Sequence, residues 1–316
     1  MITNSLEAAV AARGVQAPAV RVRGLRKAYG AVQALDGIDL TVRRGELLAV
    51  LGPNGAGKTT LVEILEGHRD ATAGEVEVLG HDPARRERAF RARIGVVLQE
   101  EGLDPAITVR EAIVAYGAAY PDPRPAAEVA DLVGLGECAD ERAATLSGGQ
   151  RRRLDLALGI AGDPELLFLD EPTTGFDPAA RRQSWELIER LRAGGTTILL
   201  TTHYLDEAQH LADRVVVVAR GRIIADGPPD ELGRSGAPAA QIAFRLPSGV
   251  PGAAAPLPAD AAVEAGRVRF STPAPTHDLA RLTAWAVARG EELDGLTVTR
   301  PNLEDVYLEL TREDRT

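Results

Sequence analysis

The glycine-rich stretch LGPNGAGKTT, residues 51–60, contains Lys58, one of two lysines in a chain of 316 residues that otherwise uses arginine. Its glycines, lysine and threonine have the spacing of a loop whose backbone N–H groups turn inward on phosphate oxygens. In such a close-fitting loop a compact ammonium reaches the β- and γ-phosphates, whereas a planar guanidinium is bulkier. The stretch therefore predicts a phosphate-binding loop with these residues: Gly52, Pro53, Asn54, Gly55, Ala56, Gly57, Lys58, Thr59 and Thr60.

The flanks of the loop favour this interpretation over its alternative, a glycine-rich turn with a surface lysine. Residues 46–51 read as a strand, and Leu61, Ile64 and Leu65 follow at helical spacing. A helix N-terminus directly after the loop adds a dipole that favours an anion. A strand, a loop and a helix in this order are the context that phosphate binding requires.

Two adjacent acids, Asp170 and Glu171, follow the apolar run Leu166–Leu169. Carboxylates at the end of a buried strand are costly to leave unpaired, and the C-terminal edge of a parallel sheet is where ligands gather in α/β proteins. Asp170 is therefore predicted to hold Mg²⁺ together with the hydroxyl of Thr59. The alternative is a purely structural pair of acids.

The apolar runs Leu166–Leu169 and Ile198–Leu200 do not alternate with polar residues, which predicts parallel strands buried on both faces. A helix at about 180–191 lies between them, and residues 214–225 read as a closing hairpin. Thr108 with Glu111 predicts a capping box at the start of a helix. The expected fold is α/β with a parallel core sheet, an antiparallel N-terminal part, a helical subdomain and a small α+β C-terminal domain.

The sequence LSGGQ at 146–150, followed by RRRLDLALGIAGDPELLFLDEP, resembles the nucleotide-binding subunit of an ABC transporter. The resemblance covers residues 20–230 and is closest to bacterial drug and antibiotic exporters of the daunorubicin-resistance type. The tail segment NLEDVYLEL, residues 302–310, is similar to the end of those subunits. The resemblance implies an ATPase that uses ATP and Mg²⁺ and energises export.

The resemblance assigns further roles around the phosphate loop. Tyr29 matches the aromatic that stacks on adenine, and Gln99 matches the residue that touches magnesium at the boundary to the helical subdomain. Glu171 matches the general base for the attacking water. His203, after the run ILLTT, resembles the switch histidine that contacts the γ-phosphate.

The resemblance also implies an assembly. Ser147 is predicted to cap a helix, whose free N–H groups form a second anion site. In the family the LSGGQ sequence is called the signature, and it contacts the nucleotide that is bound by a second copy of the nucleotide-binding domain. Asp177 matches the loop that crosses the interface, although Phe176 stands where the family usually has leucine. The chain is therefore expected to form a head-to-tail homodimer through Asp177 and the signature residues Ser147, Gly148, Gly149 and Gln150.

Composition limits where the protein works. The net charge of −10 argues against a nucleic-acid partner, and a single cysteine, Cys138, fits a reducing compartment. No apolar run is long enough to span a bilayer and no signal peptide is expected. These features fit a cytoplasmic protein, and the resemblance implies a peripheral subunit at the cytoplasmic face of the cell membrane, docked on a separate permease.

The expected organisation is a flexible arm (1–18), a nucleotide-binding domain (19–235, with helices at about 100–160) and a linker with a C-terminal accessory domain (236–316). The arginine clusters at 85–93 and 151–153 are expected on solvated helix faces, with a phosphate or partner contact open for the second. Two other functions stay open: a soluble ABC-type ATPase acting on ribosomes or DNA, and a nucleotide-binding regulator that does not hydrolyse ATP.

Overall fold

The apolar runs form a six-stranded sheet in the order β5-β6-β7-β3-β8-β9, in a computed structural model that describes residues 17–97, 103–232, 240–247, 250–251 and 254–299. The first five strands of this order are parallel, as predicted, and β9 is antiparallel to β8. The strands are β3 (Leu47–Leu51), β5 (Ile94–Val97), β6 (Leu166–Asp170), β7 (Thr197–Thr201), β8 (Arg214–Ala219) and β9 (Arg222–Gly227).

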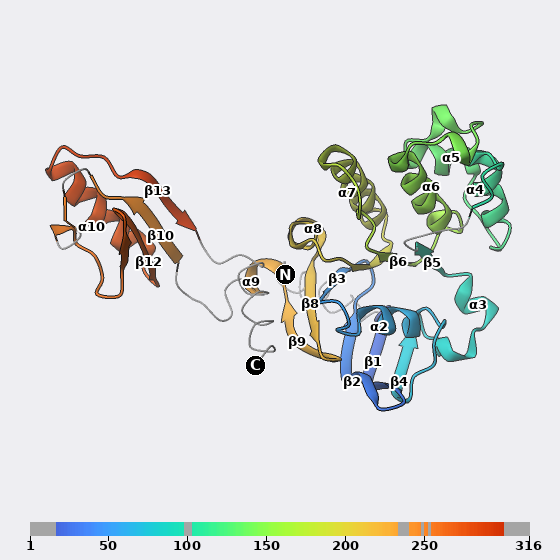
Figure 1. Ribbon diagram of the computed structural model, residues 1–316. Coiled ribbons are helices and arrows are strands. Elements are labelled where there is room, and N and C mark those ends of the chain that lie inside the picture. Colours follow the sequence, from blue (N-terminus) through green and yellow to red (C-terminus); the bar gives the residue numbers. More distant parts are fainter. Residues whose placement is uncertain (1–16, 98–102, 233–239, 248–249, 252–253, 300–316) are drawn as a thin grey trace, which may run out of the picture. The chain divides into compact units, whose positions relative to one another are not determined.

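Successive residues of the buried strands point into two different cores, which explains why these runs do not alternate with polar residues. Leu167 and Leu169 pack into a core with the helices that follow β5 and β6. Leu166 and Phe168 face the opposite core. Figure 1 shows the resulting layers of the first unit. The helices on the first face are α4 (Val109–Gly117), α5 (Ala126–Leu132), α6 (Gly148–Ile160) and α7 (Pro178–Ala193).

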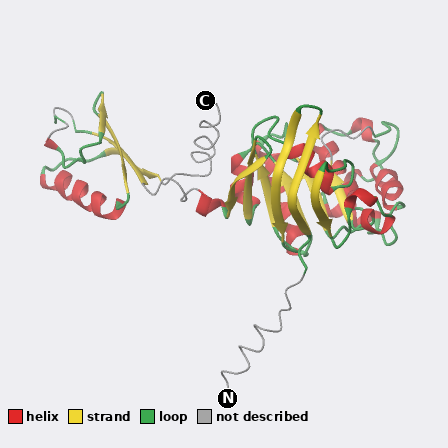
Figure 2. Ribbon diagram, turned by 90° about the horizontal axis from the view of Figure 1, so that it is seen from below, coloured by secondary structure: helices red, strands yellow, loops and turns green. Residues whose placement is uncertain are grey.

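The second core lies between the six-stranded sheet and a smaller antiparallel sheet of order β2-β1-β4, with the helix that follows the glycine loop between them. Figure 2 shows the strands of this unit from below. The elements are β1 (Val20–Tyr29), β2 (Val32–Val42), β4 (Ala73–Val78) and α2 (Lys58–Leu65), together with the short helix α3 (Arg88–Arg91), whose Phe90 lies in this core. The short helix α8 (Leu205–Leu211) contributes Leu211 to the first core. In the described residues no helix is long and apolar enough to cross a membrane.

The chain divides into two compact units, Met1–Gly227 and Pro228–Thr316, whereas the boundary expected from the sequence falls after residue 235. In the second unit an antiparallel sheet of order β11-β12-β10-β13 packs against one helix. Its elements are α9 (Pro229–Leu232), β10 (Ala240–Arg245), β11 (Ala262–Glu264), β12 (Arg267–Thr272), α10 (Pro275–Ala288) and β13 (Asp294–Thr299). Residues 1–16 of the expected arm (1–18) and the tail segment 302–310 lie outside the described residues.

One expectation is wrong: the three arginines at 151–153 do not share a solvated helix face. Arg151 is exposed, Arg153 is half-buried and Arg152 is buried, with 8% of its surface accessible. Successive residues of an α-helix point about 100° apart, so α6, which is packed on one side, cannot expose three in a row. The cluster at 85–93 is mostly exposed, apart from the buried Phe90.

Candidate nucleotide-binding site

Two glycines allow the loop between β3 and α2 to lie against its neighbours. A Cβ atom at Gly52 would lie 2.3 Å from the carbonyl oxygen of Val218. At Gly57, where φ is +107°, a Cβ atom would lie 2.6 Å from the carbonyl oxygen of Ala34. Both contacts involve backbone atoms that cannot move aside cheaply, so larger residues at 52 and 57 would displace the loop.

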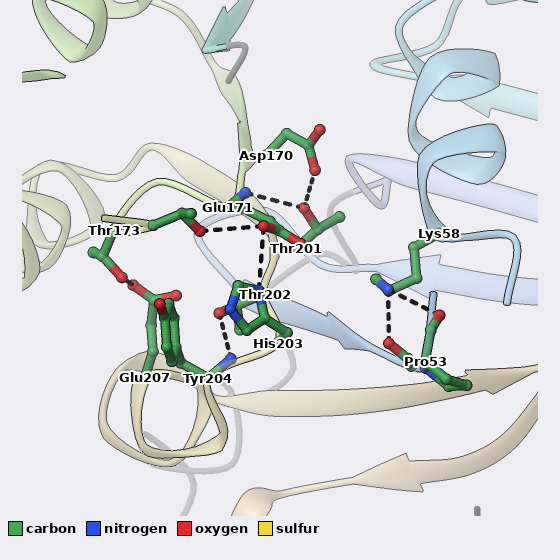
Figure 3. Close-up of polar contacts among 12 residues, drawn as sticks. Pro53, Lys58, Asp170, Glu171, Thr173, Thr201, Thr202, His203, Tyr204 and Glu207 are labelled. Atoms are coloured by element: carbon green, nitrogen blue, oxygen red, sulfur yellow. Dashed lines mark hydrogen bonds and ion pairs between the residues drawn. The ribbon is translucent and has the colours of Figure 1, made fainter. Parts of the chain in front are cut away.

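Lys58 extends from the first turn of α2 back into the loop. Its Nζ donates hydrogen bonds to the carbonyl oxygens of Gly52, at 2.6 Å, and Pro53, at 3.2 Å (Figure 3). Burial lowers the pKa of the Lys58 ammonium, and the charges of Glu171 and Asp170 act in the opposite direction. The lysine therefore lies between its own loop and the acidic end of β6.

These groups surround a cleft of about 470 Å³. Most of the predicted loop lines it, together with the two acids at the end of β6, so segments more than 100 residues apart in the chain meet here as the sequence predicts. The lining combines backbone N–H groups, an ammonium, hydroxyls and carboxylates, which suits a polyphosphate with its metal ion. The lining residues are Ala34, Asn54, Gly55, Ala56, Gly57, Lys58, Thr59, Thr60, Asp170 and Glu171.

The chain turns sharply between the two acids. Asp170 is the last residue of β6 and accepts a hydrogen bond from the Thr201 hydroxyl of β7. Glu171 has φ of +48°, in the left-handed region, and its N–H donates to the Thr201 carbonyl oxygen at 3.0 Å. A non-glycine residue held in that region costs on the order of 1–3 kcal/mol and often marks a functional turn.

His203 approaches Glu171 from the loop after β7. Its Nδ1 atom lies 3.2 Å from Glu171 Oε2, and the Thr174 hydroxyl donates to the same oxygen at 3.1 Å. The imidazole also lies against the Tyr204 ring, with centroids 4.1 Å apart. Figure 3 shows the acid and the histidine at the ends of neighbouring strands. The carboxylate is thus held by groups from two loops.

Glu207, a fully buried acid on α8, is a site residue that the sequence did not predict. It accepts hydrogen bonds from the Thr173 hydroxyl, at 2.8 Å, and from Trp185 Nε1, at 3.1 Å. Burial raises the pKa of its carboxyl group. Glu207 thereby ties the loop after Glu171 to α7 and α8. Its place four residues after His203 is the only signal that the sequence offers, and that spacing does not reveal burial.

The signature residues form a second, separate site. As predicted, Ser147 caps α6: its hydroxyl accepts the Gln150 N–H at 3.2 Å, and the Gln150 side chain accepts the Ser147 N–H at 2.8 Å. The cavity there has a volume of about 330 Å³ and shares no lining residue with the phosphate-loop cleft. Its lining residues are Gly148, Gly149, Arg151, Arg152, Asp155, Thr174, Gly175, Phe176, Asp177 and Ala180.

Two other predicted site residues, Asp177 and Tyr29, do not line the phosphate-loop cleft. Asp177 caps α7 through the N–H groups of Ala179 and Ala180, and these bonds lower the pKa of its carboxyl group. Tyr29 ends β1 and does not line the cleft; it is 40% exposed, and the Lys27 ammonium lies 5.1 Å from the centre of its ring. Gln99 lies outside the described residues.

Comparison with known proteins identifies the family of this site. The family model described as "ABC transporter" matches residues 35–174. The chain is 42% identical to the "Daunorubicin resistance ATP-binding protein DrrA3" of Streptomyces coeruleorubidus, over 94% of this chain and 97% of the relative. The chain belongs to the ABC transporter family. It is an ATP-binding subunit of such a transporter, and it hydrolyses ATP.

Other comparisons agree with this assignment of the ATP-binding subunit. The chain is 38% identical to the "Nod factor export ATP-binding protein I" of Rhizobium johnstonii, over 93% of this chain and 94% of the relative. The solved "Structure of ATP binding subunit of ABC transporter" matches this chain with a TM-score of 0.62 and 27% sequence identity. The match covers 68% of this chain and 92% of the solved chain. Residues 240–302 match a family described as "ABC transporter domain-containing protein-like, C-terminal domain".

Proposed function

We propose that this subunit works as a head-to-tail homodimer that uses MgATP to drive export of a hydrophobic small molecule through a separate permease. The observation that carries the proposal is the division of the site: one chain has a phosphate-loop cleft and a signature cavity that share no lining residue. A second copy supplies what each site lacks.

In this proposal the loop from Gly52 to Thr60 holds the phosphates, with Lys58 on the β- and γ-phosphates. Its ammonium has three N–H groups, and the bonds to Gly52 and Pro53 use two of them. Tyr29 stacks on the adenine ring, because an exposed aromatic face suits that contact.

The residues around the cleft fit Mg²⁺, a hard cation that prefers oxygen ligands. The carboxylate of Asp170 and the hydroxyl of Thr59 both line the cleft, and Gln99 adds an amide oxygen in the family pattern. When bound, the ion neutralises phosphate charge. The Thr201 hydroxyl fixes the Asp170 carboxylate from the neighbouring strand.

Glu171 acts as the general base in this proposal. It takes a proton from the water that attacks the γ-phosphorus, and the bond to the β-phosphate oxygen breaks to give ADP and inorganic phosphate. His203, 3.2 Å from Glu171, orients the carboxylate and contacts the γ-phosphate. The strained backbone at Glu171 holds the acid beyond the end of the strand.

The signature Ser147–Gln150 and Asp177 then serve the nucleotide of the partner. Ser147 caps α6, a helix of 13 residues, whose N-terminal N–H groups favour an anion. Asp177 lines the signature cavity together with Gly148 and Gly149, which supports placing it at the interface between the two copies.

Mixed dimers test this arrangement. We expect homodimers of Lys58→Ala and of Gly149→Asp to be inactive, since every site lacks one half. A hybrid isolated with two affinity tags should contain one intact site and recover part of the ATPase activity. A purified hybrid with no activity above the parent variants would contradict independent composite sites.

The relatives named for daunorubicin resistance and Nod factor export support an export function. On this basis the subunit is peripheral at the cytoplasmic face of the membrane. Tagged subunit purified from detergent-solubilised membranes should carry a polytopic membrane protein in stoichiometric amount, and ATP hydrolysis by the pair should rise with a hydrophobic substrate. Recovery with ribosomes or DNA instead would overturn the transporter assignment.

A further inference from the structure

Arg152 is a buried arginine whose guanidinium contacts the backbone of the acidic turn. Its Nη2 lies 3.2 Å from the carbonyl oxygens of both Asp170 and Glu171, and its Nε lies 3.2 Å from that of Pro172. One side chain therefore donates to three consecutive carbonyl groups. A planar guanidinium with several fixed donors suits this task, whereas an ammonium does not have the same fork.

The same arginine belongs to the helix that begins with the signature. Arg152 lies in the second turn of α6, which Ser147 caps, and its Nη1 is 3.4 Å from Asp155 Oδ2 on the same helix. Both side chains are 9% exposed. Since a packed helix moves as a rigid element, a shift at Ser147 displaces Arg152 with it.

Arg152 thus connects two sites that belong to different nucleotides. In the head-to-tail dimer Ser147 faces the partner's nucleotide, whereas Glu171 serves the nucleotide of its own chain. Glu171 has a left-handed backbone with φ of +48°, and such a conformation persists only where surrounding contacts fix it. The three bonds from Arg152 are contacts of that kind.

We propose that Arg152 is a positioning residue for ATP hydrolysis: it couples the signature helix to the backbone of Asp170–Pro172 and so sets Glu171 in its own chain. The proposal rests on the roles given above to Glu171 and Ser147. It differs from the alternative that an arginine beside the signature contacts the partner's phosphates directly.

Homodimeric variants test the positioning role. Arg152→Met keeps the length of the side chain without its donors, and we expect kcat to fall on the order of 10²-fold, the effect of misplacing a reacting group by about 1 Å. The KM for ATP should stay unchanged, and Arg152→Lys should recover part of the loss. Arg153→Gln is the matched control, because Arg153 on the same helix donates to the Gly134 carbonyl oxygen instead.

Thermal unfolding and nucleotide binding show whether each variant folds; if Arg152→Met does not fold, Arg152→Lys carries the measurement. An unchanged kcat in a folded variant would overturn the proposal, and so would a variant in which only the KM for ATP rises.

Hybrid dimers separate coupling within a chain from contact with the partner's nucleotide. In the first hybrid a Lys58→Ala chain pairs with an Arg152→Met chain, so the working Glu171 lies in the same chain as the altered arginine. In the second, a chain with both changes pairs with a wild-type chain, so the altered arginine lies beside the signature that closes the working site. We expect the first hybrid to lose activity and the second to keep that of a Lys58→Ala and wild-type hybrid.

The opposite result, or equal losses in both hybrids, would overturn the proposal. The reference hybrid of Lys58→Ala with wild type tests the proposed function separately. If this reference hybrid is inactive, the proposal that the two sites work independently is wrong. The kcat and KM of the Arg152 homodimers then still decide the role of the arginine.

Discussion

Replacing Glu171 with glutamine removes a proton acceptor while leaving the acidic turn nearly intact. The amide has the size of the carboxylate, and its oxygen can still accept from the Thr174 hydroxyl, which now donates to Glu171 Oε2 at 3.1 Å. The backbone bonds to Thr201 do not involve the side chain. We therefore expect the Glu171→Gln variant to fold and to bind ATP as the wild type does.

The loss in rate follows from the missing base. A positioned general base contributes on the order of 10²–10⁴ to the rate, which corresponds to about 3–5 kcal/mol of activation free energy. Since binding steps keep their contacts, this loss should fall on kcat, and the nucleotide-bound dimer should accumulate.

Phosphate release at saturating ATP measures kcat, equilibrium binding measures nucleotide affinity, and gel filtration with ATP detects the trapped dimer. Glu186→Gln makes the same chemical change on the exposed face of α7 and should leave all three measurements unchanged. If Glu171→Gln lowers turnover by less than about ten-fold, the loss is smaller than the contribution of a general base, and Glu171 does not have that role.

Three further variants test the loop, the packing and a buried acid. Lys58→Arg should abolish most ATPase activity with an unchanged circular dichroism spectrum, because Nζ is buried within 3.2 Å of two loop carbonyl oxygens; full activity would show that the loop accommodates a guanidinium. Gly95→Ala should lower the free energy of unfolding by about 1–3 kcal/mol, since the added Cβ would lie 2.1 Å from the Gly159 carbonyl oxygen; an unchanged urea midpoint would contradict this close contact. Burial, with Asp170 and Glu63 nearby, raises the pKa of Glu66 from 4.5 to about 8. Between these pH values the native state retains a proton that the unfolded state has lost, so stability falls as pH rises from about 4.5 to about 8 and levels off above that. Glu66→Gln should remove this fall, and urea unfolding at about pH 6 and about pH 9 should therefore show a smaller difference than in the wild type.

Local patterns were sufficient to predict the parts of the fold that position the phosphate loop. The runs Leu166–Leu169 and Ile198–Leu200 identify strands buried on both faces because no polar residue interrupts them. The caps at Thr108 and Ser147 follow from side chains that bond backbone groups within three residues. In these cases the decisive contacts join residues that are close in the sequence, or the burial follows from the two-residue alternation of side chains along a strand.

Contacts between distant segments were beyond the sequence patterns. The burial of Arg152 depends on carbonyl groups about 20 residues away, and that of Glu207 depends on Thr173 and Trp185. Charged residues are exposed by default, so the composition of either segment predicts a solvated side chain. Gly95 and Gly159 likewise look like ordinary glycines, although β5 and α6 approach each other there.

The single thiol of the chain has a practical consequence for measurement. Cys138 is half-buried, and its sulfur lies 3.2 Å from Nε2 of Gln150, whose Oε1 accepts the Ser147 N–H. A maleimide fluorophore on this thiol would label one position per subunit, next to the cap of the signature helix. The adduct would also compete with the Gln150 amide for space. An emission change from a label at Cys138 would report closure of the proposed dimer, at the cost of weakening the cap.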